Sequence, residues 1–315
     1  MKPQCLLTLA ELGPDEMDTI LSLSRRLKRI RGRSKDRPLQ GKTVALLFEK
    51  PSTRTRVSFQ VAVSELGGSS ISLGSNEIQL GRGETIEDTA RVLSRYVHAI
   101  VARVNEHLEV EHLASSSTVP VVNGLSDLYH PVQILADLLT LLERKGKLRG
   151  LKVAWIGDGN NVCNSWLIGA ATTGIRFSAA TPPGYAPNKG AVSLARSIAR
   201  STGASLTLLE DPREAASGAD CVITDTFVSM GFDKEREERV RTFLPTYRVD
   251  RQVMALAKKD AIFQHCLPAH RGEEVTDDVI DGPNSAVWDE AENRLHTTKA
   301  LLCYLMLGRT ELRKF

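Results

Sequence analysis

A short polar segment near residue 50 combines the residue types that bind phosphate groups. It directly follows an apolar run at 43–48 and consists of Ser52, Thr53, Arg54, Thr55 and Arg56. A serine at the N-cap of a helix leaves the backbone N–H groups of the first turn pointing outward, where the helix dipole favours an anion. Threonine hydroxyls and a forked guanidinium add donors that match phosphate oxygens. The segment therefore predicts an anion site, with an ordinary capped helix and solvated arginines as the alternative. No GxxxxGKS/T motif is present, so a P-loop nucleotide site is not indicated.

Five more polar clusters each follow an apolar run of strand length. They begin at Arg103, His130, Gly157, Asp225 and Cys266. Ligands of open parallel sheets bind beyond the carboxyl ends of the strands. Six such clusters, three in each half of the chain, predict a site in a cleft between two domains.

These clusters suggest different partners for a substrate. Arg103 is a candidate second phosphate ligand, or an ordinary arginine at a strand end. His130 and Gln133 flank a proline at a helix start, where an imidazole can polarise a carbonyl; the alternative is a capping histidine beside an exposed glutamine. Asp225 is suited to binding an ammonium group or to capping a helix.

Three other kinds of site receive less support. The segment 157–162 begins like a dinucleotide fingerprint, but Val162 replaces the third glycine and no acid ends the next strand. Its asparagines can instead offer amides to an amino-acid head group. His265 and Cys266 are adjacent, so their side chains point to opposite faces of an extended segment and do not form a catalytic pair. Metal binding by these two residues with His270 matches no known spacing.

The elements that position these residues alternate along the chain. Strands are predicted at 43–48, 69–73, 98–102, 119–122, 151–156, 175–179, 205–209, 220–224 and 261–265. Between them lie amphipathic stretches with helix punctuation, such as 52–66, which Gly67 and Gly68 end. Such alternation predicts an α/β protein with mostly parallel sheets flanked by helices. The polar stretch 145–150 predicts a domain boundary, giving domains 1–147 and 148–287, with the C-terminal helix at about 288–315 packed back on the first.

Composition limits the class of protein. Of 315 residues, 42% are hydrophobic and 25% charged, which is ordinary globular usage, and the net charge of +3 does not indicate nucleic-acid or membrane-surface binding. No apolar run approaches the ~18 residues of a membrane span. The N-terminal segment has acids too early for a signal peptide. The five cysteines are scattered without a CxxC pair, which indicates reduced thiols in the cytoplasm.

Several of these segments together resemble the ornithine carbamoyltransferase family. They are FEKPSTRTRVSF at 48–59, EIQLGRGETIEDTARVLSRY at 77–96, HPVQ at 130–133, DTFVSMG at 225–231, HCLP at 265–268 and ENR at 292–294. The STRTR element is shared with aspartate carbamoyltransferases, whereas the SMG and HCLP elements are absent from those enzymes. The latter two therefore favour ornithine as the acceptor.

The resemblance implies a carbamoyl-phosphate-binding first domain and an ornithine-binding second domain, with no metal and no organic cofactor. Phosphate ligands would be Ser52, Thr53, Arg54, Thr55, Gln79 and Arg103. The carbamoyl group would contact His130, Gln133, Arg294 and the backbone at Cys266 and Leu267. Ornithine would contact Asn161, Asp225, Ser229 and Met230. The catalytic residues would be Arg54, Arg103, His130, Asp225, Cys266 and Arg294. The resemblance also implies a cytoplasmic homotrimer or an assembly of trimers.

The implied activity is transfer of a carbamoyl group from carbamoyl phosphate to the δ-amino group of L-ornithine, giving L-citrulline and phosphate in arginine metabolism. Residues 226–234 are the predicted moving loop. Three alternatives remain at this stage: a carbamoyltransferase for putrescine, an acylated ornithine or aspartate; a non-catalytic protein that kept a carbamoyl-phosphate site; and a dehydrogenase, which rests only on the 157–161 segment.

Overall fold

The computed structural model describes residues 4–50, 52–74, 83–229, 231–308 and 312. By their internal contacts these fall into two units, 1–136 with 293–315, and 137–292. Each unit contains one sheet, and all of the strand pairs are parallel. This confirms the predicted fold class of two α/β domains.

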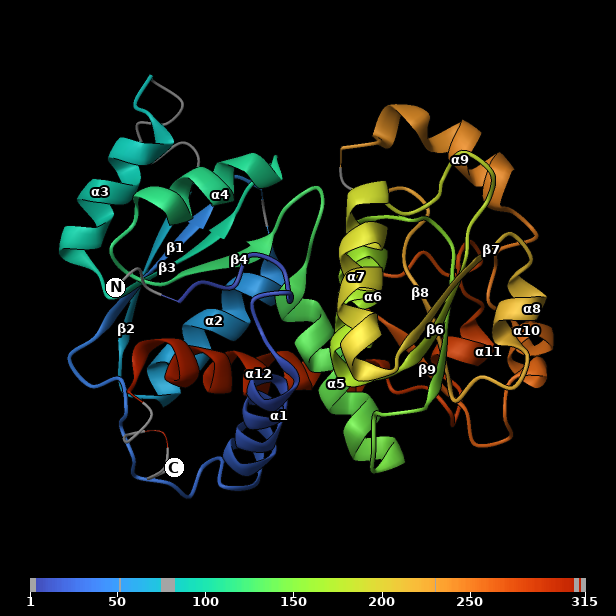
Figure 1. Ribbon diagram of the computed structural model, residues 1–315, viewed down its shortest axis with the longest axis horizontal. Coiled ribbons are helices and arrows are strands. Elements are labelled where there is room, and N and C mark those ends of the chain that lie inside the picture. The colour runs from blue at the N-terminus through green and yellow to red at the C-terminus, as the bar shows by residue number, and fades with distance from the viewer. Residues whose placement is uncertain (1–3, 51, 75–82, 230, 309–311, 313–315) are drawn as a thin grey trace. The chain divides into compact units, whose positions relative to one another are not determined.

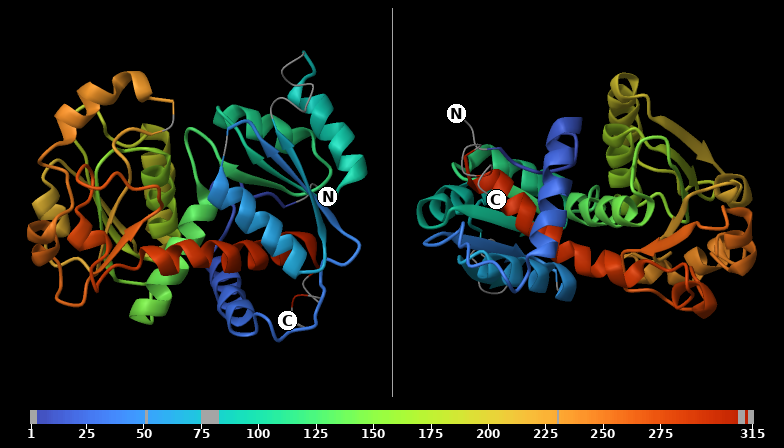
Figure 2. Two further views of the ribbon diagram at one scale, coloured as in Figure 1. Left: turned by 180° about the vertical axis from the view of Figure 1, so that it is seen from behind. Right: turned by 90° about the horizontal axis from the view of Figure 1, so that it is seen from below.

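The first unit is built on a four-stranded sheet in the order β2-β1-β3-β4. Its strands are β1 (Thr43–Phe48), β2 (Ser69–Gly74), β3 (Ala99–Arg103) and β4 (Val121–Leu125). The helices that begin in it are α1 (Pro14–Arg29), α2 (Thr53–Glu65), α3 (Ile86–Tyr96), α4 (His107–Ser116) and α5 (Pro131–Lys145). Helices α3 and α4 lie on one face of the sheet, and α2 and the end of α12 (Val287–Met306) lie on the other (Figure 1 and Figure 2). Strands β1 and β3 are apolar on both faces because helices cover both.

The second unit is built on a five-stranded sheet in the order β7-β6-β5-β8-β9. Its strands are β5 (Lys152–Ile156), β6 (Arg176–Ala180), β7 (Ser205–Leu209), β8 (Cys221–Thr224) and β9 (Ile262–His265). Its helices are α6 (Asn161–Thr173), α7 (Lys189–Thr202), α8 (Pro212–Ala216), α9 (Arg236–Phe243), α10 (Arg251–Leu256) and α11 (Asp277–Ile280), with a 3₁₀ turn, η2, at Asp233–Glu235. Helices α6 and α7 lie on one face of this sheet, and α8 and α10 on the other (Figure 1).

Local signals set the ends of several elements. All nine predicted strands form, each within two or three residues of its predicted limits. Helix α2 ends before Gly67, whose φ of 84° is one that only glycine adopts readily. The contact division cuts through α5 and α12, so each of these helices contributes residues to both units. The predicted domain limits at 147 and 288 lie instead near the C-terminal end of α5 and the N-terminal end of α12.

No helix among the described residues is both long and apolar enough to cross a membrane. All five cysteines are free thiols.

Candidate active site

The polar residues of the first unit gather where three neighbouring strands end. Phe48 at the end of β1 pairs with Arg103 of β3, and Arg103 pairs with Leu125 at the end of β4. The segments after β1 and β4 therefore leave the sheet at the same edge. We call the predicted site residues gathered there the arginine cluster: Ser52, Arg54, Thr55, Arg103, His130, Gln133 and Arg294.

Ser52 occupies the N-cap of α2 but does not cap it with its side chain. Its backbone is extended (φ −155°, ψ 109°), and its Oγ makes no capping hydrogen bond. The hydroxyl instead accepts a hydrogen bond from Nη1 of Arg103 at 3.4 Å. Ser52 is therefore the N-cap residue as predicted, but its hydroxyl contacts Arg103 and makes no side-chain cap. The first turn of α2 carries no acidic residue, so the helix start keeps its preference for an anion.

Arg294 joins two other parts of the arginine cluster. Its Nη2 donates to Oγ1 of Thr55 at 3.1 Å, and its Nη1 donates to Oε1 of Gln133. All three side chains are at least 96% buried. They come from α2, α5 and α12, which places residues 239 positions apart in the sequence in direct contact.

His130 lies at the centre of the positive charge in this cluster. It is 5% exposed. Burial, together with the charges of Arg294, Arg103 and Arg54, holds the pKa of its imidazole well below the usual range. The ring is therefore neutral near pH 7 and can donate one hydrogen bond to a carbonyl oxygen.

Three predicted phosphate ligands are either exposed or lie outside the described residues. Thr53 and Arg54 are exposed at the start of α2. Gln79 lies outside the described residues.

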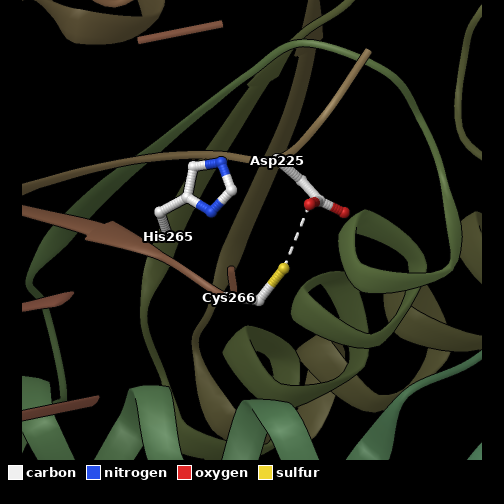
Figure 3. Close-up of side chains that lie close together, drawn as sticks. All are labelled: Asp225, His265 and Cys266. Carbon is white, nitrogen blue, oxygen red and sulfur yellow. Dashed lines mark hydrogen bonds between the residues drawn. The ribbon is translucent and has the colours of Figure 1, made fainter. Parts of the chain in front are cut away.

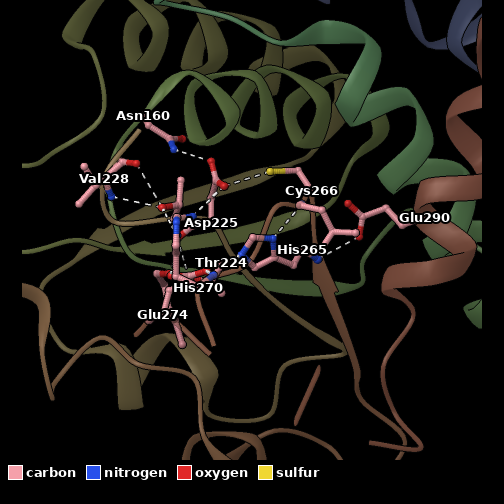
Figure 4. Close-up of polar contacts among 12 residues, drawn as sticks. Asn160, Thr224, Asp225, Val228, His265, Cys266, His270, Glu274 and Glu290 are labelled. Carbon is pink, nitrogen blue, oxygen red and sulfur yellow. Dashed lines mark hydrogen bonds and ion pairs between the residues drawn. The ribbon is translucent and has the colours of Figure 1, made fainter. Parts of the chain in front are cut away.

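The second unit brings a different set of side chains together around Asp225. This residue follows β8 and is 7% exposed. Its Oδ2 accepts a hydrogen bond from Nδ2 of Asn160 at 2.7 Å, and its Oδ1 accepts from Sγ of Cys266 at 3.0 Å and from the backbone N–H of Thr226 at 2.8 Å (Figure 3 and Figure 4). We call Asp158, Asn160, Asp225 and Cys266 the carboxylate cluster.

The thiol of Cys266 is a hydrogen-bond donor in this arrangement. Burial, followed by the charge and the hydrogen bond of Asp225, raises its pKa well above the usual value. A protonated thiol is a poor nucleophile. The ring of His265 faces Glu274 instead, at 3.2 Å from Nε2 to Oε1, so the two adjacent residues form no thiol–imidazole pair.

Metal binding by His265, Cys266 and His270 has little support from the sequence. Among the described residues, His265, Cys266 and His270 form no common group. Two other sets have ligand atoms within 4.8 Å of one another: Asp225 with His265 and Cys266, and His270 with Glu273 and Glu274. In the first set the carboxylate and the thiol already hydrogen-bond each other.

The remaining predicted ornithine ligands lie nearby in the chain. Asn161 is the first residue of α6, directly after the Asn160 that contacts Asp225. The Oγ of Ser229 is buried and has no hydrogen-bond partner among the described residues. Met230 lies outside the described residues.

Sequence reasoning missed an ion pair beside Asp225. Nη1 of Arg239 in α9 donates to Oδ2 of Asp158 at 2.8 Å and to the carbonyl of Phe227 at 3.1 Å. Burial raises the pKa of Asp158 to about 6; the Arg239 charge opposes this shift and the Asp225 charge adds to it. Arg239 gave no signal because it lies in a run of charged residues. Asp158 was part of the glycine-rich segment that resembles a dinucleotide fingerprint.

That glycine-rich segment has a structural explanation. A Cβ on Gly159 would collide with the backbone of Tyr185, Ala186 and Pro187. Gly159 therefore allows the backbone of residues 185–187 to approach closely, and its presence does not support a dinucleotide site.

Comparison with known protein families identifies the family of this chain. Residues 4–143 match the aspartate/ornithine carbamoyltransferase carbamoyl-P binding domain, and residues 149–305 match the Asp/Orn binding domain of the same family. The chain belongs to the aspartate/ornithine carbamoyltransferase family. Among its curated members, the ornithine carbamoyltransferase of Cenarchaeum symbiosum is 58% identical over 95% of this chain and 97% of that protein. The anabolic ornithine carbamoyltransferase of Pyrococcus furiosus is 52% identical over 96% of each.

Solved structures from this family agree with the fold. The ornithine carbamoyltransferase from Pyrococcus furiosus superposes with a TM-score of 0.93 at 51% identity, covering 96% of this chain and 97% of that chain. The ornithine carbamoyltransferase from Thermus thermophilus superposes with a TM-score of 0.87 at 44% identity, covering 98% and 100%.

Proposed function

We propose that this chain transfers the carbamoyl group of carbamoyl phosphate to the δ-amino group of L-ornithine, producing L-citrulline and phosphate. One observation carries the choice of acceptor. The DTFVSMG and HCLP segments meet at the hydrogen bond between Cys266 and Asp225, whose partners are 41 residues apart. Both segments resemble those of ornithine carbamoyltransferases and are absent from aspartate carbamoyltransferases. Their contact supports a shared role in binding the amine.

Carbamoyl phosphate is assigned to the arginine cluster. We propose that the start of α2, through Ser52, Thr53, Arg54 and Thr55, holds the phosphate together with Arg103 and Gln79. His130, Gln133 and Arg294, with the backbone at Cys266 and Leu267, hold the carbamoyl group. Positive charge around a buried site suits a dianionic substrate.

Ornithine is assigned to the carboxylate cluster. We propose that Asp225 binds an ammonium group, with Asn161, Ser229 and Met230 completing the contacts. The Oγ of Ser229, which has no hydrogen-bond partner among the described residues, supports this assignment, because a buried hydroxyl left without a partner is costly.

The chemistry proceeds by direct attack. An alkyl amine has a pKa of about 10.4, so the δ-amino group must first lose a proton; Asp225 and Cys266 orient the amine, and the Asp225 carboxylate accepts that proton. The amine nitrogen then bonds to the carbamoyl carbon while the carbon–oxygen bond to phosphate breaks, and the remaining extra proton on that nitrogen passes to the departing phosphate. Thr55, Arg103 and His130 donate to the developing oxyanion, where one donor is worth about 3–4 kcal/mol. Arg54 stabilises the departing phosphate. The reaction needs no metal and no organic cofactor.

Assembly and location are part of the proposal. We propose a homotrimer or a larger assembly of trimers. Val57 of α2 and Ile71 of the edge strand β2 are each about half exposed, which supports an interface on the first unit. Light scattering checks this, since a monomeric mass would contradict it. Free thiols at all five cysteines support a cytoplasmic location.

The test is an assay of carbamoylated products from carbamoyl phosphate with L-ornithine, N-acetylornithine, putrescine and L-aspartate in parallel. We expect strong preference for L-ornithine. Turnover of a different amine would retain the carbamoyl-phosphate assignment and remove the ornithine assignment. No turnover by folded protein that still binds carbamoyl phosphate would favour a non-catalytic binding protein.

A further inference from the structure

The buried imidazole of His265 connects Glu274 to the backbone of the HCLP segment (Figure 4). Its side chain is fully buried, as is that of Glu274. Nδ1 accepts a hydrogen bond from the backbone N–H of Leu267 at 2.9 Å, and Nε2 lies 3.2 Å from Oε1 of Glu274. Because Nδ1 accepts, the neutral ring carries its proton on Nε2 and donates it to the carboxylate. Glu274 therefore favours the one tautomer that can hold Leu267.

Leu267 needs this support because of its backbone conformation. Among the described non-glycine residues, it is the one with a positive φ, at 58°. A residue with a Cβ disfavours this region, and surrounding contacts must hold it there. The hydrogen bond to Nδ1 of His265 is such a contact. The direction of the backbone at Cys266 and Leu267 thus depends on the orientation of a buried ring.

Glu274 is itself firmly placed. Its Oε1 also accepts a hydrogen bond from the backbone N–H of His270 at 2.5 Å, and its own carbonyl accepts from the N–H of Val249 at 2.9 Å. The ring of His270 lies 3.0 Å from Oγ1 of Thr226, in the DTFVSMG segment. One carboxylate therefore contacts the HCLP segment through His265 and the DTFVSMG segment through His270.

We propose that Glu274 is a positioning residue for carbamoyl transfer. Its carboxylate holds the His265 tautomer, and that ring holds Leu267 in the left-handed conformation that presents the Cys266–Leu267 backbone to the carbamoyl group. This inference rests on the proposed function. Glu274 contacts no substrate in this scheme, and carbamoyl phosphate keeps its ligands in the first unit, so the loss of Glu274 slows the transfer step more than it weakens the binding of that substrate.

The first experiment compares Glu274→Ala with Glu273→Ala, the same change at the adjacent residue, whose carboxylate pairs with Arg236. We expect kcat to fall at least 30-fold in Glu274→Ala, with the KM for carbamoyl phosphate within twofold. We expect both constants to stay within twofold in the control. Glu274→Gln keeps an oxygen acceptor and should restore kcat to within about fivefold of wild type. Equal kcat losses in Glu274→Gln and Glu274→Ala, accompanied by equal losses of Tm, would indicate a structural role and overturn the proposal.

A second experiment tests whether Glu274 acts through His265. In His265→Asn, the amide oxygen takes the place of Nδ1 and can accept the N–H two residues later, but the shorter side chain does not reach Glu274. Adding Glu274→Ala to this variant should change kcat less than twofold. A further 30-fold loss in the double variant would show that the two residues act independently and would overturn the proposal.

A structure of Glu274→Ala tests the inference even if the proposed function fails. Wild-type protein that carbamoylates no amine would refute the function alone. A φ of Leu267 that turns negative in the variant, or a rotated His265 ring, would support the positioning role. An unchanged Leu267 and an unchanged ring would overturn it. If Glu274→Ala does not fold, Glu274→Asp, which retracts the carboxylate by one methylene, serves for the same measurements.

Discussion

The arginine cluster and the carboxylate cluster carry opposite charge, yet each prepares a neutral hydrogen-bond donor. Three arginines and burial keep His130 unprotonated in the first unit. Burial and Asp225 keep Cys266 protonated in the second. Under the proposed assignment, the positive cluster attracts the anionic substrate and the negative cluster attracts the cationic one, while His130 and Cys266 stay uncharged.

The largest expected effect comes from removing charge at the start of α2. Arg54→Ala should lower kcat/KM for carbamoyl phosphate by roughly 10³-fold, because it removes a charged donor to the leaving phosphate. The measurement is citrulline formation, with circular dichroism to confirm folding. Arg56→Ala on the same helix is the control and should change kcat/KM less than threefold. Near-native turnover by Arg54→Ala would remove this helix start from the phosphate site.

The matching change in the carboxylate cluster is Asp225→Asn. It should lower kcat/KM for ornithine about 10²-fold, because a charged hydrogen bond to an ammonium group is worth about 1.5–3 kcal/mol. The dissociation constant of carbamoyl phosphate should stay within twofold. The exposed Asp260→Asn serves as the control. Unchanged ornithine kinetics in Asp225→Asn would break the assignment of the two substrates to two clusters.

A smaller effect concerns stability and the lowered pKa of His130. Below pH 6.5 the unfolded chain binds a proton at this residue and the folded chain does not, so stability falls as the pH falls. Between pH 7 and 5.5 the free energy of unfolding should drop about 1 kcal/mol less in His130→Gln than in wild type. Urea unfolding at both pH values measures this. The half-exposed His112 provides the control variant, His112→Gln, which should behave like wild type.

The smallest expected effect concerns Asp158, whose pKa is about 6. As the pH rises through 6, the carboxylate ionises and its ion pair with Arg239 gains full charge, which holds the segment at Phe227 more firmly. From pH 5.5 to 7, kcat/KM for ornithine should rise about threefold more in wild type than in Asp158→Asn. A threefold change corresponds to less free energy than a shift of one pKa unit. The control is Glu235→Gln. Glu235 is another partner of Arg239 and its side chain is about half exposed, so this variant should keep the wild-type pH profile of kcat/KM. Identical profiles in wild type and Asp158→Asn would separate this ion pair from ornithine binding.

The extent to which the site was predictable differs between the clusters. Residues after β1, β3 and β4 were predicted to gather because ligands of open parallel sheets bind beyond the carboxyl ends of the strands. The side-chain partners were not predictable from that rule. The hydroxyl of Ser52 contacts Arg103 rather than the first turn of α2, and Asn160, which was not among the predicted ligands, contacts Asp225. Such choices depend on rotamers and on neighbours that are distant in the sequence.

The sequence by itself determined the nine strands, the main helix ends and the types of donor available after each strand, because apolar periodicity and capping residues act within a few positions. Only the tertiary structure decided the charge state of His130 and Cys266, the pairing of Asp158 with Arg239 and the tautomer of His265. Those properties arise from burial and from contacts between distant segments, as between Thr55 and Arg294, and local sequence carries no record of either.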